Sequence, residues 1–145
     1  MVSHTVPFTV AWRHVDAAGL IYYPNIFRYF EEAEHQLLAR LGYPHNEPAP
    51  KGIAFPRVHV ECNYLRPLQL GDSGTVTCSV TKVGEKSMTF EFDVVKYKNG
   101  KGESAGGTGG VLCAKGQIVS VTMDPATGQG VPLPTDLRAA LEGWE

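Results

Sequence analysis

PNIFRYFEEAEHQLLARL, residues 24–41, is the stretch that decides the fold, because its apolar residues recur at the spacing of an amphipathic helix. Pro24 suits the first turn of a helix, where its missing N–H is not needed, and Gly42 is typical of a helix end. The apolar stripe is wide and consists of Ile26, Phe30, Ala33, Leu37 and Leu41, flanked by Phe27, Tyr29 and Leu38. The stretch therefore predicts one long helix that the rest of the chain largely wraps.

The remaining sequence has the period of two that is typical of β-strands. Residues 5–12 alternate, and segments rich in Val, Thr, Phe and Tyr follow at 53–66, 74–83, 87–98 and 110–123, with short intervals that favour antiparallel neighbours. A short closing helix, capped by Thr135 or Asp136, is expected after a turn at 124–130. One helix with five antiparallel strands predicts an α+β fold in a single domain, residues 1–145, whose curved sheet wraps around the helix.

Composition excludes several classes of protein. The 145 residues are 43% hydrophobic and 19% charged with a net charge of −2, which favours neither nucleic acid nor an anionic membrane as a partner. The N-terminus has no signal-peptide pattern and no apolar run approaches a membrane span, so we expect a cytoplasmic location. Cys62, Cys78 and Cys113 are expected to be reduced, buried thiols, and the histidine spacing predicts no metal site.

GESAGG, residues 102–107, matches the Gly-x-Ser-x-Gly turn of serine esterases. That turn requires a helix directly after the serine, but glycines and then a strand pattern follow Ser104. In that fold the histidine also comes last along the chain, whereas every histidine here precedes Ser104. The match is therefore interpreted as accidental, and Ser104 is not expected to be a nucleophile.

HVDAAGLIYYPN, residues 14–25, is the better candidate for a site. Asp16 lies just before the helix, and Gly19 lets another molecule come close. Backbone N–H groups near Tyr23, at the helix start, lack helical partners, so they are available to stabilise a developing oxyanion. The alternative is that Asp16 only caps a turn, and composition alone favours that alternative.

The chain resembles the 4-hydroxybenzoyl-CoA thioesterase family of hotdog-fold proteins in Asp16-Ala17-Ala18-Gly19, Tyr23-Pro24-Asn25 and Arg28-Tyr29-Phe30-Glu31-Glu32-Ala33. Weaker similarities continue through Pro56, Asn63-Tyr64, Arg66-Pro67, Gly71-Asp72, Lys86-Ser87 and Leu133-Pro134. The resemblance implies a hotdog fold, a long helix wrapped by a curved antiparallel sheet. It also implies hydrolysis of an acyl-CoA thioester without a cofactor, in a homodimer or homotetramer with sites at subunit interfaces.

The resemblance also implies roles for single residues. Asp16 matches the catalytic aspartate, and Tyr23 matches the position whose backbone N–H polarises the thioester carbonyl. Glu31 matches an acidic position near the acyl group of a partner subunit, which is Asp in the aromatic-acyl enzymes. Lys86 and Ser87 match a segment that contacts CoA phosphates. His59, on a predicted strand, is a further candidate for lining the site.

Several alternatives stay open. A second hotdog subclass has its catalytic carboxylate on the helix, which makes Glu31, Glu32 and Glu34 rivals of Asp16. The carboxylate acts either as a nucleophile, through an anhydride, or as a general base. The chain could also be a non-catalytic module that binds acyl-CoA or an acyl-carrier protein. Hydration of an enoyl thioester is disfavoured, because no histidine follows Asp16 within a few residues.

Overall fold

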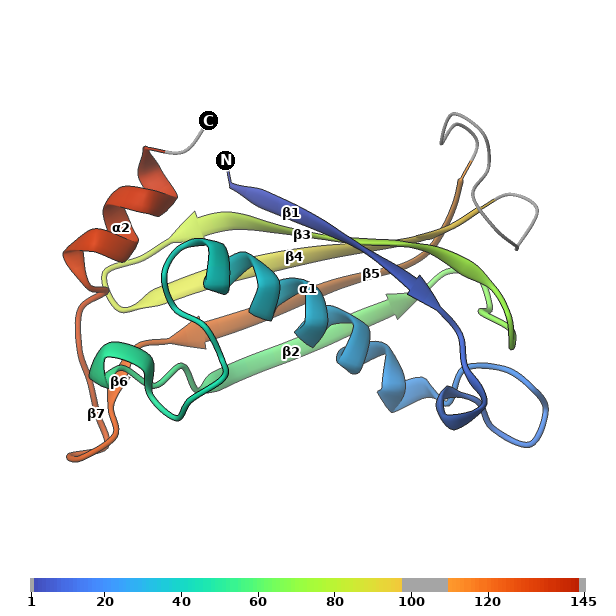
Figure 1. The fold of residues 1–145 in the computed structure, drawn as a ribbon, viewed down its shortest axis with the longest axis horizontal. Coiled ribbons are helices and arrows are strands. Elements are labelled where there is room, and N and C mark those ends of the chain that lie inside the picture. Colours follow the sequence, from blue (N-terminus) through green and yellow to red (C-terminus); the bar gives the residue numbers. More distant parts are fainter. Residues whose placement is uncertain (1, 98–109, 144–145) are drawn as a thin grey trace.

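The protein folds as one curved antiparallel sheet with a long helix lying across one of its faces (Figure 1). The computed structural model describes residues 2–97 and 110–143, so the prediction for Ser104 lies outside the described residues. The elements of this sheet and helix are β1 Ser3–Thr9, α1 Ile26–Arg40, β2 Arg57–Tyr64, β3 Ser73–Val83, β4 Ser87–Lys96 and β5 Val111–Val121. The predicted α+β fold with five strands and one long helix is confirmed.

The strand order is β1-β3-β4-β5-β2, which differs in one respect from the order along the chain. β1 pairs with β3, and β2 pairs with β5 at the far edge, so β2 and β3 are not neighbours. The expectation that short intervals make all successive strands antiparallel neighbours is therefore wrong for β2 and β3, because residues 65–72 carry the chain from one edge of the sheet toward the other. β1 and β2 are the two edges.

The core lies between α1 and the inner face of the sheet. Phe30 of α1 is fully buried and stacks on Phe92 of β4, with ring centroids 4.5 Å apart. Gly116 of β5 lies directly beneath the Phe30 ring, so the missing side chain lets the helix approach the sheet closely. The other large buried residues of this layer include Ile26, Leu37, Leu38, Met88 and Phe90.

Replacing Gly116 by alanine is expected to destabilise the fold. A Cβ at this position would lie 2.2 Å from Cε2 of Phe30, and the ring is held by its stack on Phe92. Overpacking of a core typically costs about 1–3 kcal/mol in the free energy of unfolding. Urea denaturation measures the change. Gly130→Ala is the control, since its Cβ would meet nothing closer than 3.7 Å. Equal stability of the two variants would contradict the packing described here.

The C-terminal part covers the end of the sheet opposite to the start of α1 (Figure 1). A small hairpin, β6 Met123–Asp124 and β7 Gln129–Gly130, encloses the predicted turn, and α2 Thr135–Glu142 follows. The closing helix is confirmed, but its predicted cap is wrong. Pro134 occupies the cap position, and Asp136 lies inside the first turn, where its Oδ1 accepts a hydrogen bond from the Leu137 N–H.

The three cysteines are free thiols, with Cys78 and Cys113 buried and Cys62 half-buried. Burial raises the pKa of the Cys62 thiol to about 11. In the described ranges no three His, Cys, Asp or Glu side chains gather as a metal site would require. No described helix is long and apolar enough to cross a membrane.

Candidate active site

Residues 14–22 form a small hairpin directly before α1. The Tyr22 N–H donates to the His14 carbonyl at 2.9 Å, and the Asp16 N–H donates to the Leu20 carbonyl at 2.8 Å. Gly19 has a φ of +80°, the left-handed conformation that glycine adopts without strain, and this closes the turn. The sequence DAAG therefore forms a defined turn that holds Asp16 at a fixed position.

The hairpin is attached to the segment that precedes β3. The Ile21 N–H donates to the Leu68 carbonyl at 2.8 Å, and the Leu70 N–H donates to the Gly19 carbonyl at 2.9 Å. These two bonds anchor both sides of the turn. The loop is thus positioned by backbone contacts with a distant part of the chain, as a binding loop on a rigid scaffold is.

Asp16 is exposed, and one of its carboxylate oxygens orders the turn. Oδ1 accepts hydrogen bonds from the Ala18 N–H at 2.9 Å and the Leu20 N–H at 3.2 Å. The turn-capping alternative is therefore part of what Asp16 does. Its Oδ2 has no hydrogen-bond partner within residues 2–97 and 110–143, so this oxygen remains available to a ligand.

The helix start follows at once. Tyr23–Asn25 is a turn of 3₁₀-helix leading into α1, and the Tyr23 N–H has no hydrogen-bond acceptor in the described part of the chain. Tyr23 is 66% exposed, and the Tyr64 hydroxyl donates to the Tyr23 carbonyl at 2.7 Å. This last bond ties the helix start to the end of β2. The sequence alone did not reveal this role of Tyr64, because the hydrogen bond joins residues that are 41 positions apart.

Glu31 lies eight residues after Tyr23, about two turns further along the helix, and is exposed. It lines a hollow of about 340 Å³ together with Pro24, Asn25, Phe27 and Arg28. Glu31 and the start of α1 therefore lie at the same part of the surface of one chain, and its position relative to the acyl group of a partner subunit stays a prediction.

The other two helix carboxylates differ in their surroundings. Glu34 is buried and accepts a hydrogen bond from Nη2 of Arg57 at 2.6 Å, so it is a structural ion pair. Glu32 is exposed and accepts from the Gln36 side chain at 2.7 Å. Neither carboxylate lines the hollow that holds Glu31.

His59 lies on the other face of the sheet. Its neighbour Val60 pairs with the buried Ile118 on the face that α1 covers, so His59 points away from the helix. It is paired with Glu61 at 2.7 Å. Within one chain the structure does not bring His59 to Asp16.

Lys86 and Ser87 are also remote from Asp16. Lys86 lies in the turn between β3 and β4 and Ser87 is the first residue of β4, while the Asp16 hairpin is anchored just before β3 begins. The 11 residues of β3 separate the two places, a span of roughly 35 Å at about 3.3 Å per residue. Lys86 of the same chain therefore cannot contact a thioester held beside Tyr23.

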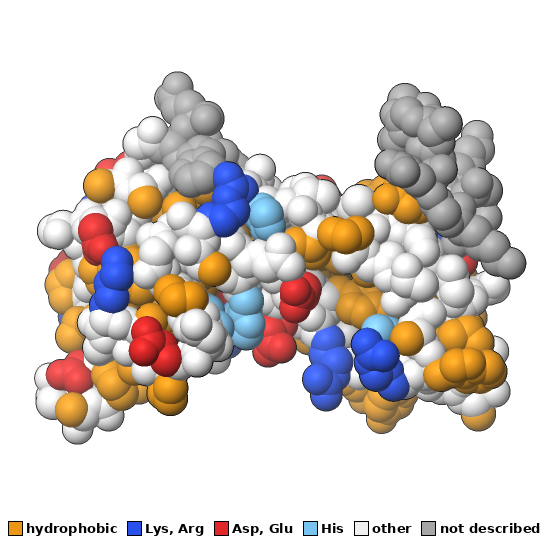
Figure 2. Space-filling model, in the orientation of Figure 1, with side chains coloured by type: hydrophobic (Ala, Val, Ile, Leu, Met, Phe, Trp, Pro, Cys, Tyr) orange, Lys and Arg blue, Asp and Glu red, His pale blue; other side chains and the backbone are white. Residues whose placement is uncertain are grey.

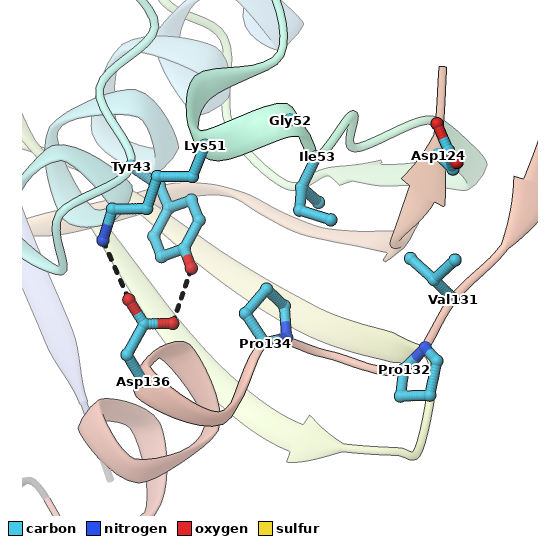
Figure 3. Close-up of a pocket in the computed structure, with 9 residues that line it drawn as sticks. All are labelled: Tyr43, Lys51, Gly52, Ile53, Asp124, Val131, Pro132, Pro134 and Asp136. Atoms are coloured by element: carbon cyan, nitrogen blue, oxygen red, sulfur yellow. Dashed lines mark hydrogen bonds and ion pairs between the residues drawn. The ribbon is translucent and has the colours of Figure 1, made fainter. Parts of the chain in front are cut away.

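A larger hollow of about 530 Å³ lies at this second end of the molecule (Figure 3). Two of its charged groups pair with each other: Asp136 accepts from Lys51 at 2.8 Å, and it also accepts from the Tyr43 hydroxyl at 2.7 Å. The third, Asp124, accepts from the Ala126 N–H at 2.9 Å. Hydrogen bonds from Lys51 and then Tyr43 lower the pKa of Asp136 to about 2. These contacts join α2 to the segment after α1, and they leave no free charged group for chemistry among Tyr43, Lys51 and Asp136.

Comparison with known proteins relates the chain to enzymes that hydrolyse CoA thioesters. The model of the family described as the thioesterase-like superfamily matches residues 10–141. The chain is 33% identical over 127 residues to a 1,4-dihydroxy-2-naphthoyl-CoA hydrolase of Prochlorococcus marinus (strain NATL2A), covering 82% of this chain and 74% of that protein.

Solved structures agree. The structure of BH1999 gentisyl-coenzyme A thioesterase superposes with a TM-score of 0.77 at 28% identity, covering 92% of this chain and 98% of that one. A 4-hydroxybenzoyl-CoA thioesterase mutant complexed with 4-hydroxybenzoyl-CoA has a TM-score of 0.78 at 19% identity, covering 94% and 96%. The second likeness shows a shared fold alone.

Proposed function

Because the chain belongs to the thioesterase-like superfamily, we propose that it hydrolyses an acyl-CoA thioester to the free acid and CoA. The proposal rests above all on one placement: Asp16 sits in an anchored hairpin that ends beside the unpaired N–H of Tyr23. The similarity to hydrolases and thioesterases named for CoA esters of aromatic acids supports CoA as the carrier.

In the proposed reaction the Tyr23 N–H, at the positive end of α1, donates to the thioester oxygen and stabilises the negative charge that develops there. Asp16 then attacks the carbonyl carbon, or removes a proton from a water that does so. The C–S bond breaks, the CoA thiolate leaves and takes a proton, and water hydrolyses any anhydride formed on Asp16. A thioester is electrophilic enough for this route to need no cofactor.

The proposed site requires a second subunit. In one chain Asp16 is exposed to water and Lys86 is at the opposite end of the sheet. Edge strand β2 leaves Val58, Val60 and Tyr64 exposed at 61%, 50% and 47%, whereas edge strand β1 contains Pro7, which blunts pairing. Antiparallel pairing of β2 with its copy would place Lys86 and Ser87 of the partner subunit at the Asp16 end, where CoA phosphates would lie.

Val60→Lys is expected to convert the oligomer to monomers and to remove turnover with it, because a charged side chain then lies at the middle of the proposed seam. Sedimentation velocity measures the assembly, and release of CoA measures activity. Ala126→Lys, in the exposed turn between β6 and β7, is the matched control and should change neither. A monomeric wild-type protein with full activity would contradict the proposal.

The function itself is tested by release of free CoA from a panel of thioesters: 1,4-dihydroxy-2-naphthoyl-CoA, gentisyl-CoA, 4-hydroxybenzoyl-CoA, butyryl-CoA and palmitoyl-CoA. We expect turnover with at least one aromatic member. Tight binding of these thioesters without release of CoA would replace the proposal with the non-catalytic binding module.

A further inference from the structure

A second polar hollow adjoins the proposed site and has no role in the reaction described above. Arg13, His14, Asn25 and Arg28 line it, and its volume is about 310 Å³. It shares Asn25 and Arg28 with the hollow that holds Glu31. We call it the basic hollow.

The basic hollow carries uncompensated positive charge. Both Arg13 and Arg28 are exposed, and neither forms an ion pair with a carboxylate within the described residues. The described lining of the hollow contains no carboxylate. Figure 2 shows two Lys or Arg side chains side by side, with a histidine next to them, in the half of the molecule where α1 begins. This charge stands out on a chain whose net charge is −2.

His14 adds a third donor. Its Nδ1 accepts from the Ala11 N–H at 3.1 Å and bonds to the Tyr29 hydroxyl at 3.0 Å. Because Nδ1 is an acceptor, the proton of the neutral ring is on Nε2, and the hydrogen-bond network assigns this tautomer. Burial, followed by the charges of Arg13 and Arg28, lowers the pKa of His14, which favours this neutral form.

Asn25 shows where the basic hollow lies relative to the proposed oxyanion donor, the Tyr23 N–H. Its side-chain amide donates to the His14 carbonyl at 3.0 Å, so one wall is tied to the Asp16 hairpin. Asn25 is also two residues from Tyr23, and consecutive Cα atoms are about 3.8 Å apart, so the two lie within roughly 8 Å. An anion bound here is close to the thioester carbonyl. The phosphates of an extended CoA are separated from that carbonyl by the whole pantetheine arm.

We propose that the basic hollow binds a carboxylate carried by the acyl group, so that the preferred substrates are CoA thioesters of dicarboxylic acids. The proposal rests on the thioesterase function above. Guanidinium groups are suited to it, since they form paired, charge-assisted hydrogen bonds to a carboxylate. A phosphate of the carrier has the same chemistry and is the competing source of the anion.

The test compares 4-carboxybenzoyl-CoA with 4-methylbenzoyl-CoA, which have the same ring and differ in one charge. Wild-type protein is expected to favour the carboxylated thioester by roughly 10–100-fold in kcat/KM, mainly through KM, as charge-assisted hydrogen bonds typically give. The double variant Arg13→Gln, Arg28→Gln should lose this preference, so that the ratio of the two kcat/KM values falls to about one. Lys82→Gln, an exposed cation on β3, is the control and should keep it. A ratio near one in the wild type would overturn the inference while the function stands.

Repeating the comparison with the pantetheine thioesters of the same two acids shows whether the anion comes from the acyl group or from CoA. 4-Carboxybenzoyl-pantetheine has no phosphate. An acyl carboxylate is supported if wild-type protein still prefers the carboxylated pantetheine thioester and if the double variant has lost that preference. If the arginine changes weaken both CoA thioesters equally and have no effect on the pantetheine thioester, the hollow binds a carrier phosphate and the inference is wrong.

A binding measurement covers the case in which no thioester is hydrolysed, an outcome that would contradict the proposed function. Calorimetry then compares terephthalate with 4-methylbenzoate. Tighter binding of terephthalate to wild type, lost on changing Arg13 and Arg28, would still support a carboxylate site. Equal binding of the two acids would overturn it.

Discussion

Replacing Asp16 by asparagine is expected to lower kcat by at least about 100-fold while the protein remains folded, in line with the usual contribution of a positioned base or nucleophile. The amide has the shape of the carboxylate, and its oxygen still accepts from the Ala18 and Leu20 N–H groups, so the hairpin is retained. The negative charge is lost, and with it both nucleophilic attack and activation of water. Steady-state release of CoA measures the effect, and thermal unfolding verifies the fold.

The helix carboxylates provide the matched controls. Glu32→Gln removes an exposed charge next to Gln36 and should leave kcat within a factor of about two, as expected for a solvated side chain. Glu31→Gln tests the neighbouring hollow and is expected to alter KM for the acyl group more than kcat. Full activity of Asp16→Asn, together with an inactive Glu31→Gln, would transfer the chemistry from the hairpin to α1.

The largest expected effect on stability is that of Arg57→Ala. Glu34 is 1% exposed, its Oε2 is held by Arg57 at 2.6 Å, and its Oε1 is buried without a hydrogen-bond partner in the described part of the chain. Removing Arg57 leaves an uncompensated buried carboxylate, which typically costs about 3–5 kcal/mol. We expect a fall in Tm on the order of 10 °C, measured by calorimetry.

An exposed pair gives the comparison. Lys115 and Asp93 are 2.7 Å apart on the open face of the sheet, with side chains 52% and 48% exposed. Lys115→Ala should lower the free energy of unfolding by no more than about 1 kcal/mol, because water replaces the lost partner. Adding Glu34→Leu to Arg57→Ala should recover much of the stability. A loss for Arg57→Ala no larger than that for Lys115→Ala would show that Glu34 is not isolated from water.

Part of the candidate site could be predicted from the sequence. Asp16, Gly19 and Tyr23 are close together in the chain, so the local pattern placed them on one loop and helix start, where the structure has them. His59 and Lys86 are different, since their position relative to Asp16 depends on which strand lies beside which. The sequence suggested one site containing all of them, but a single chain holds them apart.

Residues that sequence reasoning missed share a physical cause. Arg13 and Arg28 lie 15 positions apart, and they meet because the hairpin folds back against α1. The sequence offered Glu34 as a rival of Asp16, and it gave no sign of the buried ion pair that Glu34 forms with Arg57, 23 positions further on. The periodicity of a single helix or strand gives no information about residues that are so far apart in the sequence.

The sequence by itself determined which segments become helix and strand, because periods of 3.6 and 2 decide which side chains can share an apolar face. It also determined which groups the loop before α1 carries, among them the Asp16 carboxylate and the glycine that closes the turn. Only the tertiary structure decided that β2 lies at an edge, that His59 faces away from the helix, and that two arginines enclose one hollow. These features depend on contacts between segments far apart in the chain, which burial of the whole core selects and no single stretch encodes.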